Sequence, residues 1–368
     1  MKIASLEIFQ YTLSLLMPLK LAGKFYQNRA GIVVRLRDND GRTGVGEVAP
    51  LPGWHQENLH STLLQLSQDI PAFLKKINQS VPQTASSDKL LKNLSGDFFP
   101  SVGWGIDMAL LQLWANQRGQ PLHEIFGREL QDIIEINALL TGDPQKIQQD
   151  ALRRKEEGYH TLKVKVGQRL LDAEIKLIKE IRNTLGPEVK IRLDANQAWS
   201  ITDAVYFARS VEHSGIEYLE EPLRRFEDMS RLQSETDLAL AMDETLYLQS
   251  PDQIQFPSSV KYLILKPTRL GDVNRFFDWV RLAEEKKLKV VISSSFESGI
   301  TLAGLAHFAG MLHPGGLAMG LDTWRWFKED LLEEKPIIRQ GRIDVREFAS
   351  QGQEISWDRL QLLEEIYF

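Results

Sequence analysis

The chain has 368 residues, of which 43% are hydrophobic and 26% charged, and its formal net charge is −6. This composition is typical of a globular protein long enough for one large domain or two, and the acidic balance argues against a nucleic-acid partner. The absence of cysteine excludes disulfides, zinc–thiolate sites and cysteine nucleophiles. No run approaches the ~20 apolar residues of a membrane span, and residues 1–16 resemble a strand more than a signal peptide. We therefore expect a cytoplasmic protein.

Residues 1–130 combine alternating strand patterns with two helical stretches, at about 56–78 and 101–118. Within the strand patterns, Asn39-Asp40-Gly41 is a strong turn signal between two alternating runs, which predicts a β-hairpin. This mixture predicts a small α+β domain over residues 1–130.

A glycine pattern at residues 44–49 matches a relaxed form of the dinucleotide-binding fingerprint. That fingerprint requires a helix to begin within it, so that the helix N-terminus faces the pyrophosphate. Pro50 and Pro52 follow at once and make such a helix improbable on chemical grounds. We therefore set nucleotide binding aside.

From residue 131 onward, strand patterns alternate with helical patterns at intervals of one strand, one helix and two loops. One such helix is predicted at 170–186, where Gly186-Pro187 ends it, and another begins at the capping residue Asp272. Alternation of this kind indicates either a doubly wound sheet or a closed α/β barrel, and the regularity of eight units favours a barrel over 131–324. The last residues, 325–368, are too many for a barrel tail and are predicted to pack back onto the first domain. The eight strand patterns are 133–142, 161–167, 189–196, 216–222, 238–245, 260–268, 288–296 and 315–323.

Charged side chains stand at the ends of five consecutive predicted strands. In a barrel of parallel strands these ends meet at one mouth, where catalytic groups are normally found. A Lys-x-Lys pair on a strand is usually a solvated edge, and an acid after a strand is usually a turn or helix-capping residue. Those readings do not explain why three acids follow one another with lysines on both sides. The strand ends carry, in order, Lys163 and Lys165, Asp194, Glu220 or Glu221, Asp243, Lys266, and Ser293 to Ser295.

Three converging carboxylates would repel one another, and a divalent cation removes that repulsion. Oxygen ligands without cysteine favour a hard ion, for which Mg²⁺ is the natural candidate. Such an ion can also bind a substrate carboxylate and make the neighbouring α-proton acidic. A lysine next to a second lysine and a dication would have a lowered pKa and could remove that proton as a general base.

Five motifs in order, "KVKVG", "RLDANQAW", "YLEEPL", "MDET" and "LKPT", resemble the enolase superfamily in its muconate-lactonizing branch. The resemblance implies an α+β capping domain, a modified (β/α)7β barrel and a C-terminal segment that returns to the cap. Within that branch, residues 293–310 and the "GLDT" of 320–323 resemble the o-succinylbenzoate synthase family. The activity implied is the Mg²⁺-dependent dehydration, through an enediolate, of a small carboxylate, 2-succinyl-6-hydroxy-2,4-cyclohexadiene-1-carboxylate, in menaquinone and phylloquinone biosynthesis.

The resemblance also implies roles for particular residues. Lys165 would be the acid/base, Lys163 would tune it, and Lys266 would stabilise the enediolate from the opposite face. Glu220 is preferred to Glu221 as a metal ligand because adjacent strand residues cannot both face inward. Residues 46–58 resemble a lid loop, although an ordinary proline-braced turn is an equal alternative. The remaining assignments are Asp194 and Asp243 as metal ligands, and Arg192, Asn196, Ser293 and Gly320 as residues of the substrate site.

Racemases of N-acylamino acids and dipeptide epimerases share the same motifs, and Lys266 would serve them equally well as a second base. Dipeptide epimerases typically carry an aspartate pair near "GLDT" that grips a substrate amino group, whereas this chain offers only Asp322. A non-catalytic barrel remains the alternative from another class, but it would require the loss of a key residue. The sequence contains no decisive clue to oligomeric state.

Overall fold

The cap is built on an antiparallel sheet. The computed structural model describes residues 2–21, 23–82, 84–94, 96–312 and 315–368. The turn at Gly41, whose φ is 81°, closes the predicted hairpin between the second and third strands. It is fixed by Asp38, whose Oδ1 accepts hydrogen bonds from the backbone of Asp40 and Arg42 at 2.9 and 2.8 Å. The sheet has the order β13-β1-β2-β3, with β1 at Ile3–Leu21, β2 at Lys24–Asp38, β3 at Thr43–Val48 and β13 at Gln361–Tyr367.

Helices pack on this sheet. The single helix predicted at 56–78 is instead two helices, because Pro71 stands in the first turn of the second one and cannot continue the first. The long helix α4 lies so close to the sheet that a Cβ on Gly46 would be 1.8 Å from the carbonyl oxygen of Gly105. The glycines of the set-aside nucleotide pattern therefore serve packing. The cap helices are α1 (Leu59–Gln68), α2 (Ile70–Ser80), α3 (Ser87–Leu91), α4 (Pro100–Arg118) and α5 (Leu122–Ile125).

Seven parallel strands in chain order form the barrel wall. An eighth segment closes the ring, since Met319 bridges to Ile136 on one side and Gly320 bridges to Ser293 on the other. The Gly320 amide donates to the carbonyl of Ile292 at 2.8 Å. The predicted (β/α)7β barrel is confirmed. Its strands are β5 (Ala138–Leu140), β6 (Thr161–Lys165), β7 (Lys190–Asp194), β8 (Ile216–Glu220), β9 (Leu240–Met242), β10 (Val260–Leu265) and β11 (Lys289–Ile292).

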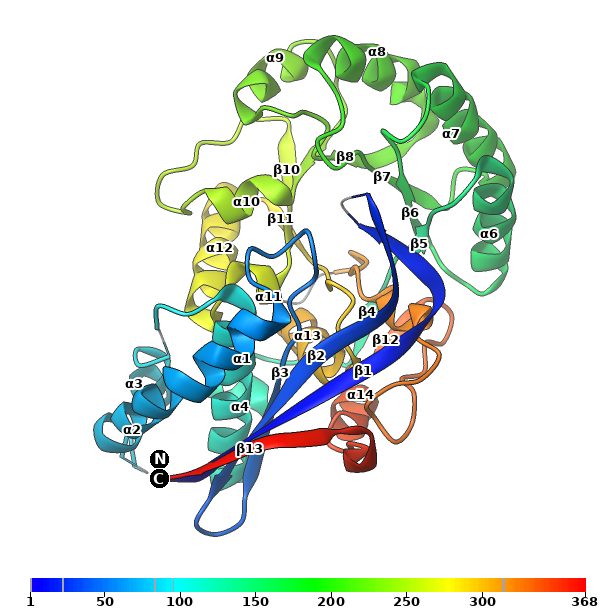
Figure 1. Cartoon of the computed structure of the whole chain (residues 1–368). Coiled ribbons are helices and arrows are strands. Elements are labelled where there is room, and N and C mark those ends of the chain that lie inside the picture. The colour runs from blue at the N-terminus through cyan, green and yellow to red at the C-terminus, as the bar shows by residue number, and fades with distance from the viewer. Residues whose placement is uncertain (1, 22, 83, 95, 313–314) are drawn as a thin grey trace.

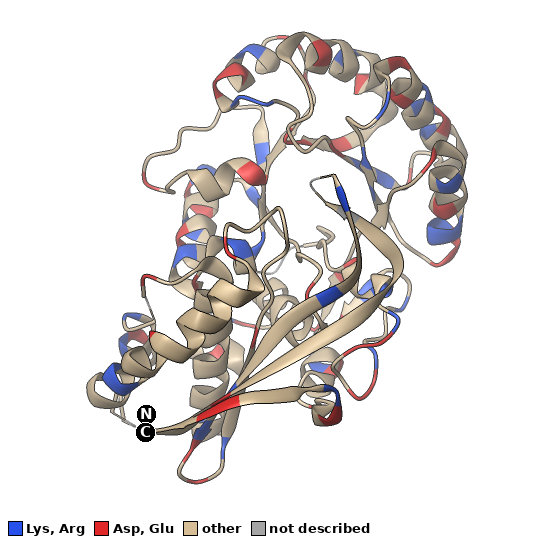
Figure 2. Ribbon diagram, viewed as in Figure 1, with Lys and Arg blue, Asp and Glu red and all other residues tan. Residues whose placement is uncertain are grey.

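Helices surround the ring of strands on the outside (Figure 1). The predicted cap of one of them is present, since Asp272 Oδ1 accepts from the Arg275 amide at 2.8 Å. The ribbon of Figure 2 shows charged residues along the outer helices and also on the strands of the ring. No helix in the described ranges is long and apolar enough to cross a membrane. The helices are α6 (Pro144–Glu156), α7 (Leu171–Leu185), α8 (Ile201–Val211), α9 (Met229–Gln233), α10 (Glu244–Leu248), α11 (Pro267–Leu270), α12 (Val273–Lys286), α13 (Gly299–Met311) and α14 (Val345–Gln351), with 3₁₀ turns at Glu212–Ser214, Phe226–Asp228, Asp322–Trp326 and Trp357–Arg359.

The C-terminal segment divides between the two parts of the molecule. Its last strand, β13, pairs with β1 in the cap, as predicted, and the N- and C-termini lie together in Figure 1. An earlier piece, β12 (Arg342–Asp344), pairs instead with β4 (Ile133–Glu135) beside the barrel. Only part of the tail therefore returns to the cap, and the domain boundary near residue 130 stays a prediction.

Candidate active site

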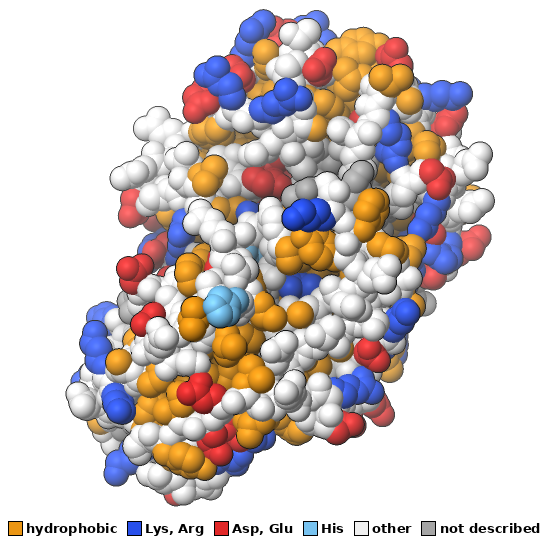
Figure 3. Space-filling model, viewed as in Figure 1, with side chains coloured by type: hydrophobic (Ala, Val, Ile, Leu, Met, Phe, Trp, Pro, Cys, Tyr) orange, Lys and Arg blue, Asp and Glu red, His pale blue; other side chains and the backbone are white. Residues whose placement is uncertain are grey.

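A cavity of about 880 Å³ lies where the carboxyl ends of the barrel strands meet the cap. Its barrel side is mainly polar and includes both lysines of β6. Its cap side is apolar and is formed by the β1–β2 hairpin and the loop at 46–58, which contributes Gly53 and Trp54. Over the face of the molecule seen in Figure 3, acidic and basic side chains are interspersed without a large patch of one sign. The cavity is thus lined by residues from both the barrel and the cap.

The two lysines of β6 face the neighbouring acids. Strand register places Lys165 beside Asp194 and Asp194 beside Glu220. Lys163 Nζ lies 2.8 Å from Asp194 Oδ2 and 2.7 Å from Glu220 Oε1, and Lys165 Nζ lies 2.6 Å from Asp194 Oδ2. Residues i and i+2 of a strand share one face, so both ammonium groups reach the same spot.

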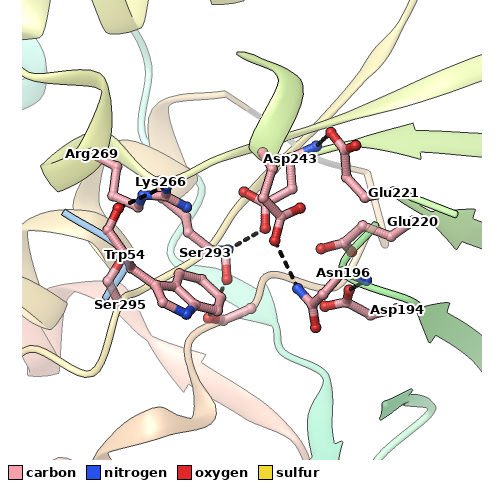
Figure 4. A network of polar contacts seen from close by, with 12 residues as sticks. Trp54, Asp194, Asn196, Glu220, Glu221, Asp243, Lys266, Arg269, Ser293 and Ser295 are labelled. Carbon is pink, nitrogen blue, oxygen red and sulfur yellow. Dashed lines mark hydrogen bonds and ion pairs between the residues drawn. The ribbon is translucent and has the colours of Figure 1, made fainter. Parts of the chain in front are cut away.

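The third acid and the third lysine lie across the site. Lys266, which follows β10, forms an ion pair with Asp243 and is only 4% exposed. Tyr247 donates a hydrogen bond to the other oxygen of Asp243 at 2.6 Å. Figure 4 shows Lys266 on one side of Asp243, and Glu220 and Asp194 on the other. Three carboxyl side chains therefore face three lysine side chains at this site.

Burial and the neighbouring charges together set the pKa values of these side chains. Burial favours the neutral form of Asp194, but the ammonium groups of Lys163 and Lys165 outweigh it and hold the pKa of Asp194 well below its usual range. Burial and the charge of Asp194 raise the pKa of Glu220 well above its usual range. Burial also disfavours a charged Lys163, yet Asp194 and Glu220 raise the pKa of Lys163. The charges of Asp194 and Glu220 thus outweigh the effect of burial on Lys163. The expectation that a second lysine and a dication lower the pKa of the acid/base lysine stays a prediction.

Three residues without glycine's freedom adopt left-handed backbone conformations around the acids. They are Asn196, Gln197 and Glu221, with φ of 43°, 60° and 40°. Such conformations cost of order 1 kcal/mol each and concentrate at functional sites. Glu221 faces away from the other acids and accepts hydrogen bonds from the amides of Asp243 and Thr245 at 2.9 and 2.7 Å. The strand alternation that preferred Glu220 is thus seen in the structure.

Of the other residues predicted for the substrate site, some line the cavity and one does not. Ser293 and Gly320 both line the cavity, and a Cβ on Gly320 would lie 2.6 Å from Ser293 Oγ. Arg192 does not line it. Its guanidinium lies deeper in the barrel, where it donates to Glu217 at 2.6 Å and to Asn137 at 2.9 Å. Arg192 therefore supports the site from beneath and does not line the substrate cavity, where it was predicted to lie.

The loop at 46–58 brings a residue that sequence reasoning missed. The ring of Trp54 covers the lysines, with its centroid 4.3 Å from Lys266 Nζ and 5.8 Å from Lys165 Nζ. Arg269 donates to the carbonyl of Trp54 at 3.0 Å, and its guanidinium also lies over Tyr247. The sequence does show an aromatic residue inside a proline- and glycine-rich loop, which could have indicated a role for Trp54. The position of Trp54 at the site, however, depends on how the cap docks on the barrel.

Two buried cap residues hold that loop against the barrel. Arg29 donates to the carbonyls of Pro50, at 2.8 Å, and of Phe296, at 3.0 Å. Glu47 accepts from the amide and the hydroxyl of Ser298, at 3.0 and 2.9 Å. Since Ser298 caps α13, these contacts fix the cap loop to the loop that follows the seventh barrel strand.

The acids fit a hard divalent cation by their chemistry. Within the described ranges, no three acidic or histidine side chains are already gathered in a metal-binding geometry, because lysines stand between them. All donors are carboxylate oxygens, which Mg²⁺ prefers. Glu220 Oε2 is buried and lacks a hydrogen-bond partner among the described atoms, so it could serve a cation. Cation binding would require Lys163 and Lys165 to release Asp194, Lys163 to release Glu220, and Lys266 to release Asp243.

A capped (β/α)7β barrel carries its lysines and three acids at the mouth where barrel enzymes place their active sites. The chain belongs to the enolase superfamily. Residues 146–359 match the family described as enolase C-terminal domain-like, and residues 3–113 match the MenC N-terminal domain.

Characterised relatives agree in sequence over most of the chain. It is 32% identical to the o-succinylbenzoate synthase of Pasteurella multocida, over 87% of this chain and 89% of that protein. It is 29% identical to the chloroplastic protein PHYLLO of Arabidopsis thaliana, covering 90% of this chain but only 21% of that longer protein.

Solved structures share the fold. The L-Ala-D/L-Glu epimerase of Bacillus subtilis superimposes with a TM-score of 0.83 at 24% identity, over 94% of this chain and 96% of that one. A muconate lactonizing enzyme of Pseudomonas fluorescens gives 0.80 at 23% identity, over 93% and 94%. The fold and the superfamily are therefore established, and the substrate is a separate question.

Proposed function

We propose that the chain is an o-succinylbenzoate synthase, which dehydrates 2-succinyl-6-hydroxy-2,4-cyclohexadiene-1-carboxylate to 2-succinylbenzoate. The observation that carries the proposal is the placement of Lys165 and Lys266 on opposite sides of three acids. It occurs in a chain about 30% identical to several synthases over nearly its whole length.

Lys165 would carry the proton. It reaches the cavity from β6, so its neutral amine could take the proton from the carbon next to the substrate carboxylate. The same ammonium group could then return that proton to the departing hydroxyl on the same face, releasing water. The substrate loses one proton and then one hydroxide, which together make one water, so the ring becomes aromatic without any oxidant. Lys266 would remain an ammonium group, and its charge would stabilise the negative charge that develops on the other face.

Asp194, Glu220 and Asp243 would hold Mg²⁺. When bound, the ion would neutralise the charge that develops on the substrate carboxylate. The proposed substrate carries two carboxylates, one on the ring and one on the succinyl chain, and the cation together with the lysines of the site would offset their negative charge.

The other walls suit the remainder of such a substrate. Ser293 and the bare backbone of Gly320 leave room for a chain beside the barrel seam. Leu19, Leu21 and Trp54 offer an apolar roof for the ring and exclude water from the reacting carbon.

A second candidate is racemisation of N-acylamino acids, because Lys266 faces the site from the side opposite to Lys165. Dipeptide epimerisation is less well supported. Asp322, the one aspartate of the "GLDT" motif, already accepts from Tyr159 at 2.9 Å and pairs with Arg325 at 2.8 Å. Its charge is therefore compensated and is not free to bind a substrate ammonium group.

One assay separates these candidates. The purified protein is incubated with Mg²⁺ and either the cyclohexadiene substrate or an N-succinylamino acid. We expect 2-succinylbenzoate to form, and its formation is measured by the change in absorbance. Loss of optical rotation from the amino acid without any dehydration would refute the synthase assignment.

A further inference from the structure

A chain of hydrogen bonds connects Lys165 to a carboxylate that the proposed mechanism does not use. Lys165 Nζ donates to Asn196 Oδ1 at 2.7 Å, and Asn196 Nδ2 donates to Glu244 Oε1 at 2.8 Å. The three residues come from the ends of three different strands, β6, β7 and β9. Glu244 also lines the cavity.

The backbone at Asn196 is held in an unusual conformation that serves this chain of bonds. Asn196 and Gln197 are both left-handed, although neither is glycine. The strain is held in place because the Gln197 amide donates to the Glu221 carbonyl at 2.7 Å and the Asn196 amide donates to Asp194 Oδ1 at 3.1 Å. A conformation that costs free energy is retained here, and its result is that the Asn196 side chain points between Lys165 and Glu244.

An amide has an acceptor end and a donor end, so only one orientation of Asn196 serves both neighbours. With Oδ1 toward the ammonium group and Nδ2 toward Glu244, both contacts are favourable. If the amide were reversed, its NH₂ group would face Lys165, which is also a donor, and its carbonyl oxygen would face Glu244, which is also an acceptor. Glu244 therefore selects the orientation in which Asn196 can hold Lys165.

We propose that Glu244 is a positioning residue that orients Asn196 and, through it, fixes Lys165 before the reacting carbon. The proposal rests on the proposed role of Lys165 as the acid/base. Without an acceptor at position 244, Asn196 is free to rotate. Lys165 would then keep only Asp194, which draws its ammonium group toward the acids. Glu244 acts through its hydrogen-bond acceptor and is not a ligand of the cation.

Three variants test the acceptor. Glu244→Leu removes it, and Glu244→Gln removes the charge but keeps a carbonyl oxygen at the same place. Glu7→Leu removes a buried carboxylate that pairs with Arg35 on the cap sheet, and so controls for a general loss of stability.

For Glu244→Leu we expect kcat for dehydration to fall about 30-fold with KM within about threefold of wild type, because a misplaced acid/base slows the reaction without weakening binding. Glu244→Gln should recover kcat to within about threefold, and Glu7→Leu should leave kcat unchanged. Equal losses in Glu244→Gln and Glu244→Leu would overturn the proposal.

Metal affinity is the second readout. Titration with Mg²⁺ in a calorimeter should give Glu244→Leu a Kd within about threefold of wild type, whereas Asp243→Asn should bind far more weakly. A Glu244→Leu protein that loses Mg²⁺ affinity as strongly as Asp243→Asn would show that Glu244 is a ligand, which contradicts the proposal.

A crystal structure of Glu244→Leu decides the matter without any substrate. We expect the Asn196 amide to turn away from Lys165, and an unchanged contact between the two would overturn the proposal. If the wild-type protein forms no 2-succinylbenzoate, the proposed function fails, but this structural comparison still tests the role of Glu244.

Discussion

The barrel mouth and the cap contribute different chemistry to one cavity. The barrel side supplies the charged groups, and these are paired with one another over distances below 3 Å. The cap side supplies proline, leucine, glycine and tryptophan. Reactivity and exclusion of water are thus assigned to separate parts of the chain. Changes in the barrel should therefore abolish the reaction, and changes in the cap should weaken binding or closure.

The largest effect is expected on the barrel side, at the proton carrier. Lys165→Ala removes the amine that we assign to proton transfer, so the dehydration rate should fall by about 10⁴-fold. Circular dichroism should show an unchanged fold. Lys176→Ala on the exposed face of α7 is the control and should retain full activity. Near wild-type activity in Lys165→Ala would refute the mechanism.

A slightly smaller loss is expected for Asp243→Asn. The change removes a proposed Mg²⁺ ligand and the counter-charge of the buried Lys266, so activity should fall by about 10³-fold. Rates measured over a series of Mg²⁺ concentrations check this. Activity that returns fully at high Mg²⁺ would limit the role of Asp243 to metal affinity, and activity that is never lost would contradict it.

The cap should respond differently. Trp54→Ala removes the apolar roof and the contact with Lys266, so KM should rise about 10-fold while kcat changes less than in the barrel variants. Trp54→Phe keeps an aromatic face and should stay close to wild type. A Trp54→Ala protein that lost kcat as severely as Lys165→Ala would end the distinction between the two parts.

The smallest effect concerns the pH dependence of cap docking. Burial, opposed by Glu57 and aided by Arg269 and Arg29, lowers the pKa of His55 to about 4. The Leu51 amide donates to His55 Nδ1 at 2.9 Å, which requires the neutral ring.

Since the folded-state pKa lies below the ordinary value of about 6.5, the unfolded chain binds the extra proton first. Stability should therefore fall as the pH drops from about 6.5 to about 4, by at most about 2 kcal/mol for this partly exposed ring. Denaturant unfolding of wild type and His55→Gln at several pH values checks this, because the difference between them should vary only in that window. A constant difference would contradict it.

The same two regions differ in how far sequence could predict them. In the barrel, each functional side chain ends a strand, and parallel strands bring their ends together whatever the loops do. The order of the strands along the sequence was therefore enough to place Lys163, Asp194 and Lys266 together at the mouth of the barrel. Strand alternation correctly placed the side chain of Arg192 on the inner face of the barrel, as for Asp194. It did not show how far Arg192 lies from the mouth, because a residue two positions earlier on the strand lies one layer deeper inside the barrel.

In the cap, position depends on tertiary packing. Trp54 reaches the lysines only because Arg29 and Glu47 tie its loop to the barrel, and these contacts join residues far apart in the chain. Glu244 was overlooked for a related reason. It follows a proposed metal ligand directly, so pattern alone assigns it to the same motif, and its link to Asn196 appears only when two strand ends meet.

The pairing of β13 with β1 has a consequence for how the molecule is made. Ser5 lies beside Tyr367, so neighbours in the cap sheet are separated by nearly the whole chain. Contacts of such long range are slow to form, because the entropy of closing the intervening loop must be overcome first. During synthesis on the ribosome, β1 emerges before the barrel, and one of its edges stays unpaired until β13 has followed. The barrel strands can therefore pair with one another before the cap sheet is complete.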